Sequence, residues 1–180
     1  MLAADRAPGW NRRFAFERWP DLDASLWRAV RDEARARAKA TLPFAIEGAD
    51  RHGGAISIAD LSARNAGVAN LVKFTVADAA HWRPTRAVAP DGGVRPPLTV
   101  LCNPPYGERL GEGEDLVSSW RALGRFLSER CRGGRAFVLS GNPDMLPHIG
   151  LPTSRQLSVM NGQIECRLLD YDLRDPPPAP

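Results

Sequence analysis

The sequence predicts an α/β protein with a doubly wound, largely parallel sheet that is closed by an antiparallel hairpin. Short apolar and β-branched runs alternate with stretches of helical periodicity along the 180 residues. Near the C-terminus, two strand-like runs flank Asn161-Gly162, the strongest short sequence signal for a hairpin turn. A chain of this length suits one domain, which we expect at residues 1–173, followed by a disordered Pro-rich tail at residues 174–180.

The composition is that of an ordinary globular protein, with 43% hydrophobic residues, 25% charged residues and a net charge of +3. No apolar run approaches the roughly 20 residues that span a membrane, and the N-terminus lacks the apolar segment of a signal peptide. The cysteines are widely spaced and the histidines lack metal-ligand spacing, so we predict neither a disulfide framework nor a metal site. These features fit a cytoplasmic protein without a membrane partner.

At the N-terminus, Met1–Arg6 is predicted to end a helix, which Ala7-Pro8-Gly9 breaks. Aromatic and charged residues then alternate as far as Pro20. This aromatic segment has two interpretations: a flap that packs on the core, or a platform that binds nucleic-acid bases. Its aromatic residues are Phe14, Phe16 and Trp19.

A surface helix is predicted from Asp23, a favourable N-cap residue, to about Ala40. We expect it to cover a sheet with its apolar side and to carry an exposed ion pair between Glu33 and Arg37. The apolar positions with helical spacing are Leu26, Trp27, Val30 and Ala34.

Two strands are predicted next, at Phe44–Asp50 and Val72–Val76, on either side of a second helix. A loop at His52-Gly53-Gly54 is expected before that helix, and Gly67 is expected just after its end as the C′ residue. A Pro- and Gly-rich loop then fills Arg83–Pro97.

The second half of the chain predicts two buried strands, at Leu98–Cys102 and Ala136–Ser140, because both are short and continuously apolar. Between them, apolar residues from Leu116 to Cys131 recur at helical spacing and predict one face of a helix. The remaining elements are a helical turn and the two hairpin strands, at Pro143–Leu146, Arg155–Met160 and Gln163–Leu173.

The most specific motif, Asn103-Pro104-Pro105-Tyr106, directly follows the strand that ends at Cys102. Ligands of open α/β sheets bind at the carboxyl ends of strands, and the two prolines end this strand because they remove ladder donors and fix φ. The Asn103 side-chain oxygen and the Pro104 carbonyl can accept both N–H groups of an exocyclic base amine, which turns its lone pair toward an electrophile. The Tyr106 ring can stack on the base. The alternative is a plain turn that ends a strand.

This motif resembles motif IV of class I S-adenosylmethionine-dependent amino-methyltransferases. Its extension, Gly107-Glu108-Arg109-Leu110-Gly111, is similar to that of the bacterial ribosomal large-subunit RNA guanine-N2 methyltransferase family, whose members usually carry an upstream THUMP RNA-binding domain. Residues 7–19 and 161–168 resemble the same family, so the similarity spans residues 1–173. The resemblance implies a Rossmann-like class I methyltransferase sheet with a C-terminal antiparallel hairpin. It further implies S-adenosylmethionine as cofactor and methyl transfer to an exocyclic amino group of ribosomal RNA, guanine N2 being favoured.

The resemblance also assigns the site, with no metal in it. Asp50 would accept hydrogen bonds from the ribose hydroxyls of the cofactor and Asp78 from its adenine amino group, although both also suit plain turns. The implied catalytic residues are Asn103, Pro104, Pro105 and Tyr106. The implied cofactor-binding residues are Asp50, Arg51, Asp78, Ala79 and Asn103, and the implied substrate-binding residues are Tyr106 and Arg109.

One part of the family pattern is not found in this sequence. The family binds the methionine part of its cofactor with a strand and a Gly-x-Gly-type loop at a helix N-terminus, and no such loop follows a strand here. By resemblance, Met1 falls inside the helix after that loop. We therefore expect a partial catalytic domain, with the first strand, the Gly-rich loop and any THUMP domain upstream. That first strand would lie between the strands that end at Asp50 and Cys102.

Other functions remain open at this point. The same Asn-Pro-Pro-Tyr motif serves enzymes that methylate adenine in DNA or a glutamine side chain of a protein. A catalytically silent, truncated binding module is a third possibility, which the missing Gly-rich loop favours.

Overall fold

The computed structural model describes residues 1–9, 11–85, 98–105, 107 and 115–174. It contains two compact units, Met1–Asp78 and Ala79–Pro180. The elements of the first unit are η1 (Leu2–Ala4), η2 (Ala15–Arg18), α1 (Ala24–Arg37), β1 (Ile46–Asp50), α2 (Gly53–Asn65), η3 (Ala69–Leu71) and β2 (Val72–Val76). The elements of the second unit are β3 (Thr99–Cys102), α3 (Leu116–Arg130), β4 (Arg135–Ser140), η4 (Pro143–Ile149), β5 (Arg155–Asn161) and β6 (Ile164–Asp172).

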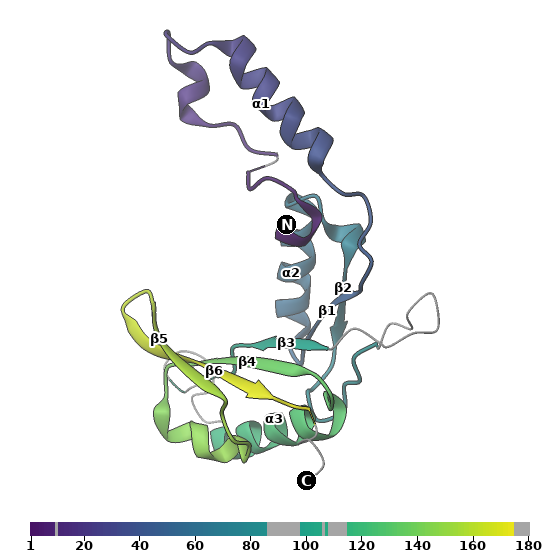
Figure 1. Cartoon of the computed structure of the whole chain (residues 1–180), viewed down its shortest axis with the longest axis vertical. Helices are drawn as coiled ribbons and strands as arrows, with labels where there is room; N and C mark the ends of the chain where they lie inside the picture. Colours follow the sequence, from purple (N-terminus) through teal and green to yellow (C-terminus); the bar gives the residue numbers. More distant parts are fainter. Residues whose placement is uncertain (10, 86–97, 106, 108–114, 175–180) are drawn as a thin grey trace, which may run out of the picture. The chain divides into compact units, whose positions relative to one another are not determined.

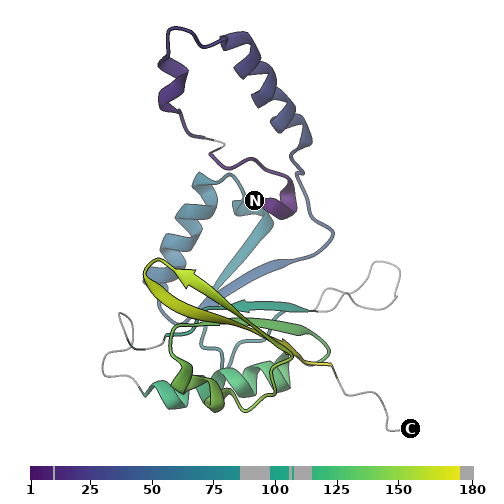
Figure 2. The same cartoon turned by 60° about the vertical axis from the view of Figure 1, so that its left-hand side comes forward.

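In the first unit, β1 and β2 form a parallel two-stranded sheet in which Asp50 pairs with Val76. Helix α2 connects the two strands and packs along them (Figure 2). The expected loop before α2 is wrong, because the helix already begins at Gly53. The Asp50 Oδ1 atom accepts a hydrogen bond from the His52 backbone N–H at 2.7 Å and closes the turn in two residues. Gly67 follows the helix with a φ of 68° and confirms the predicted C′ residue.

The second unit contains a four-stranded sheet in the order β3-β4-β6-β5. Strands β3 and β4 are parallel, whereas β4, β6 and β5 pair antiparallel. Helix α3 lies along one face of this sheet (Figure 1). The core between them consists of buried side chains, chiefly Trp120, Leu123, Phe126, Leu127, Val138, Leu169 and Tyr171. This core gives the strand end at Cys102 a rigid support.

A glycine lets the chain after β4 approach α3 closely. A Cβ atom on Gly124, in the middle of α3, would lie 2.0 Å from the Ile149 carbonyl oxygen at the end of η4. No rotamer change relieves that clash, because the obstructing atom belongs to the backbone. Gly124 therefore sets the spacing between α3 and η4.

The α/β architecture with a C-terminal antiparallel hairpin is confirmed. Strand β2 has the predicted bounds, and the other strands differ from the predictions by one or two residues at their ends. The hairpin turn consists of Gly162 and Gln163, one residue later than predicted, because Asn161 already pairs with Ile164. The described strands form two separate sheets.

Helix α1 differs most from its prediction. Its N-cap is Asp23 as predicted, with Oδ1 accepting from the Ser25 and Leu26 N–H groups at 2.8 and 3.1 Å. No α1 residue is buried, so the expected cover over a sheet is wrong. Arg37 pairs with Asp5 at 3.2 Å and not with Glu33, because the chain near Met1 returns to the end of α1.

Cys131 and Cys166 are buried, Cys102 is largely buried, and none of these three described cysteines forms a disulfide. Burial raises the pKa of the Cys102 thiol to about 12. No helix within the described ranges is long and apolar enough to cross a membrane.

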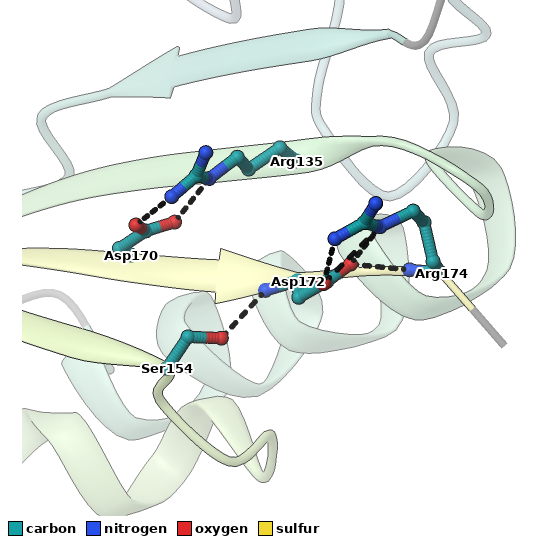
Figure 3. A network of polar contacts seen from close by, with 5 residues as sticks. All are labelled: Arg135, Ser154, Asp170, Asp172 and Arg174. Atoms are coloured by element: carbon teal, nitrogen blue, oxygen red, sulfur yellow. Dashed lines mark hydrogen bonds and ion pairs between the residues drawn. The ribbon is translucent and has the colours of Figure 1, made fainter. Parts of the chain in front are cut away.

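A polar network closes the end of the four-stranded sheet on the face away from α3 (Figure 3). The Arg135 guanidinium donates to both carboxylate oxygens of Asp170, at 2.8 and 2.5 Å, and lies 5.3 Å from the Phe137 ring centroid. The hydrogen bond from Arg135 lowers the pKa of Asp170, whose side chain is only 8% exposed. Asp172 pairs with Arg174, and its N–H donates to Ser154 Oγ at 3.3 Å. The network therefore links β4, β6 and the start of β5.

We predict that Asp170→Asn lowers the free energy of unfolding near pH 7 by about 1 kcal/mol, since solvent screens the exposed side of the guanidinium. The pKa of Asp170 is lowered in the folded state, so this stabilisation is complete above its ordinary value of 3.8. It is lost as the pH falls through the lowered folded-state pKa. Urea denaturation near pH 7 and near pH 2 measures the effect.

The control is Asp172→Asn, which removes an exposed carboxylate whose partner, Arg174, lies two residues away. We expect a smaller change there. An Asp170→Asn deficit that is equal at both pH values would contradict the assigned role of the ion pair.

Candidate functional site

The Asn-Pro-Pro turn emerges from the supported end of β3. Cys102, the last residue of the strand, pairs with Val138 of β4, and its side chain packs against the core. Asn103 follows with an exposed side chain. Among the described residues, neither the Asn103 amide nor the Pro104 carbonyl has a hydrogen-bond partner. Two acceptors from consecutive residues are therefore open to a ligand.

The third residue of the turn is held by the core. The indole Nε1–H of Trp120 donates to the Pro105 carbonyl at 2.9 Å, and the Trp120 side chain is fully buried. This hydrogen bond satisfies a donor that burial would otherwise leave unpaired. It also occupies the Pro105 carbonyl, whereas the Pro104 carbonyl has no donor among the described residues.

Helical spacing predicts Trp120 on the apolar face of its helix but does not predict this contact. A signal for it exists in the sequence, because a buried Trp needs an acceptor for its N–H group. Helix α3 is itself started by Asp115, whose Oδ1 accepts from the Ser118 N–H at 3.0 Å. The side-chain and backbone hydrogen bonds from Ser118 lower the pKa of Asp115 and stabilise its charge at the helix N-terminus.

The cofactor carboxylates predicted from the sequence lie in the first unit, at the carboxyl ends of the paired strands β1 and β2. Asp50 is the last residue of β1 and Asp78 lies two residues after β2. Since Asp50 pairs with Val76, both acidic residues belong to the same edge of this sheet. The hydrogen bond from the His52 N–H to Oδ1 fixes the Asp50 carboxylate, and its Oδ2 atom has no partner among the described residues. The geometry fits a carboxylate that accepts from a hydroxyl.

The structure describes two of the other four predicted site residues. The exposed Arg51 side chain donates from Nε to His52 Nε2 at 3.2 Å. Ala79 is partly buried and packs against the core of the second unit. Tyr106 and Arg109 lie outside the described residues. Within the described ranges, no group of three or more His, Cys, Asp or Glu residues has the arrangement of a metal site.

A family profile, protein sequences and solved structures all relate this chain to methyltransferases. The profile of the family described as "RMKL-like, methyltransferase domain" matches residues 1–170. The ribosomal RNA large subunit methyltransferase K/L of Shewanella frigidimarina is 34% identical over 193 residues, covering 100% of this chain and 25% of its own length. The chain thus spans about a quarter of that relative.

Two solved structures are similar to the chain over most of its length. SMU.472, a candidate methyltransferase crystallised in complex with SAH, superposes with a TM-score of 0.80 and 27% identity, covering 95% of this chain and 43% of that one. A protein of Listeria monocytogenes, described as a predicted N6-adenine-specific DNA methylase, superposes with a TM-score of 0.76 and 26% identity. That match covers 94% of this chain and 41% of the Listeria chain. The fold is therefore that of class I methyltransferases.

We predict that Trp120→Phe lowers the free energy of unfolding by about 1 kcal/mol, because the ring still fills the core while the Pro105 carbonyl loses its donor. Trp120→Ala should cost about 3–5 kcal/mol, because it also leaves a cavity. Urea denaturation followed by circular dichroism measures both.

The matched control is Trp82→Phe. The Trp82 ring stacks on Phe126 at 5.7 Å, but its N–H has no acceptor among the described residues. A Trp120→Phe variant as stable as the Trp82→Phe variant would show that the hydrogen bond to Pro105 contributes nothing.

Proposed function

This chain belongs to the family of RMKL-like methyltransferase domains, and from that premise we propose that it carries part of the site for S-adenosylmethionine-dependent methyl transfer to ribosomal RNA. We place that partial catalytic domain within residues 1–173. The observation that carries the proposal is the pair of open acceptors on Asn103 and Pro104, on a turn whose next carbonyl is held by Trp120. The Shewanella relative is named as a ribosomal RNA methyltransferase, which supports RNA as the substrate.

The chemistry follows from the two acceptors. Bound S-adenosylmethionine supplies a methyl group made electrophilic by its positively charged sulfur. The Asn103 side-chain oxygen and the Pro104 carbonyl accept the two N–H groups of the amine and direct its lone pair. The chain thereby acts by positioning and electrostatics, and no residue of the turn has to serve as a general base. The methylated nitrogen becomes acidic, and its proton leaves to water.

We assign cofactor binding to Asp50, Arg51, Asp78, Ala79 and Asn103. The fixed Asp50 carboxylate, with its open Oδ2 atom, supports the role of ribose acceptor. The SAH bound in SMU.472 supports S-adenosylmethionine as the cofactor of this fold.

The proposed acceptor is guanine N2, with Tyr106 stacking on the base and Arg109 contacting RNA, and with an upstream THUMP-type domain as a further RNA contact. An adenine amino group in DNA is the second candidate, because the Listeria protein is described as a predicted N6-adenine-specific DNA methylase. The name of the Shewanella relative favours RNA over DNA.

We predict that Asn103→Ala lowers kcat for methyl transfer by about 10²–10³-fold, with a smaller change in KM, because its acceptor matters most in the transition state. The assay uses the full-length product of the gene and ribosomal RNA, and mass spectrometry identifies the methylated nucleoside. The matched control is Asn70→Ala, which removes an exposed amide that donates to the Ala40 carbonyl at 3.3 Å. Near-full kcat in Asn103→Ala, or a methyl group on an atom other than an exocyclic amino or amide nitrogen, contradicts the proposal.

We also predict that the 180-residue chain alone binds S-adenosylmethionine weakly. Asp50 and Asp78 suit the adenosine part, whereas no Gly-x-Gly loop follows a strand in this sequence to hold the carboxylate. Titration calorimetry should show no saturable micromolar binding. An N-terminal extension that supplies such a strand and loop should tighten the binding, and Asp50→Ala in that extended protein should weaken it. Micromolar binding by the 180-residue chain itself is the contrary result.

A further inference from the structure

We infer that the segment formed by residues 11–37 is an RNA-contact surface, in which arginines along one side of α1 bind phosphates and the exposed ring of Trp19 stacks on a base. This inference rests on the proposed function for the choice of RNA as ligand. It adds a contact surface that none of the assigned catalytic or cofactor residues shares.

The aromatic residues of this segment form a cluster of their own. Phe14 and Phe16 stack at 5.5 Å between ring centroids, and Trp27 of α1 packs edge-on against both, at 6.1 and 4.9 Å. Trp19 contacts Phe16 edge-on at 6.4 Å, yet 63% of Trp19 is exposed. The cluster therefore fixes the position of Trp19 and leaves its ring available, as a base-stacking site requires.

Arginines line the side of α1 next to this cluster. Arg28, Arg31 and Arg35 are separated by three and four positions, which places them on one side of a helix, beside Trp27. The Arg31 guanidinium lies 5.9 Å from the Trp27 ring centroid. By helical spacing, Leu26 and Val30 lie on the other side of α1 from these arginines, with Trp27 between the two groups. The helix thus separates a cationic side from a small apolar side.

Residues 11–37 contain seven arginines and five carboxylates, which leaves a net charge of +2 on the segment. Asp23 caps α1, and Glu17 Oε1 accepts from the Phe14 N–H at 2.9 Å, so both are used in local structure. Arg35 forms an exposed pair with Asp32 at 3.1 Å, which solvent weakens. Five other arginines of the segment form no ion pair among the described residues: Arg12, Arg13, Arg18, Arg28 and Arg31.

Arginine guanidinium groups together with an exposed, held aromatic ring form the combination that binds single-stranded nucleic acid. A protein partner would instead be expected to cover the apolar side, where Leu26 is 63% and Val30 47% exposed. The charge complementarity with RNA favours the cationic side.

The test is fluorescence anisotropy of a labelled single-stranded RNA oligonucleotide with nanomolar amounts of the 180-residue chain, at several salt concentrations. The double variant Arg28→Ala, Arg35→Ala should weaken binding about tenfold and reduce the slope of log Kd against log salt by about one to two. The double variant Arg28→Lys, Arg35→Lys should keep most of that slope, because it keeps both positive charges. Trp19→Ala should weaken binding about tenfold at an unchanged slope, because stacking carries no charge.

Two controls locate the surface. Arg64→Ala removes an exposed arginine on α2, paired with Asp60 at 2.6 Å, and should leave binding unchanged. The double variant Leu26→Ser, Val30→Ser changes the apolar side of α1 and should also leave RNA binding unchanged. Circular dichroism confirms that each variant keeps its helix content.

The inference is overturned if the double alanine variant binds like the wild type, if the wild type does not bind RNA, or if the apolar-side variant is the one that weakens binding. None of these results depends on methyl transfer. Failure of the proposed function has a different signature, in which the full-length gene product places no methyl group on RNA.

Discussion

The hydrogen bond between the Trp120 indole and the Pro105 carbonyl connects the most buried part of the second unit to its most chemically specific turn. Trp120 is fixed by the core that α3 forms with β4 and β6, and that core also receives the Val100 and Cys102 side chains of β3. The strand end and the carbonyl after it are thus held from two directions. The geometry at Asn103 and Pro104 is consequently a property of the core rather than of the turn alone.

Local patterns in the sequence predicted much of this fold. The apolar run of β2 and the cap residue Asp23 of α1 were identified because both are decided by neighbouring residues. The start of α2 at Gly53 was not, since it depends on how the Asp50 carboxylate closes the turn. The pairing of Arg37 with Asp5 was also missed, because it joins residues far apart in the chain.

Local sequence patterns also predicted only part of the geometry at the candidate site. The Asn-Pro-Pro-Tyr motif predicted acceptors on Asn103 and Pro104 from residue types, and neither group has a hydrogen-bond partner among the described residues. The hydrogen bond that occupies the Pro105 carbonyl comes from Trp120, fifteen residues further along the chain. A periodic pattern identifies Trp120 as buried but does not identify the acceptor of its N–H group.

Cys102 lies one residue before Asn103, which we propose as an acceptor that orients the reacting amine. A thiolate is a far stronger nucleophile than the amine of a nucleic-acid base, so a reactive cysteine here would compete for the methyl group. Burial raises the pKa of this thiol to about 12, which leaves only about one molecule in 10⁵ as thiolate at neutral pH. The packing that supports the turn therefore also keeps the Cys102 thiol protonated at neutral pH.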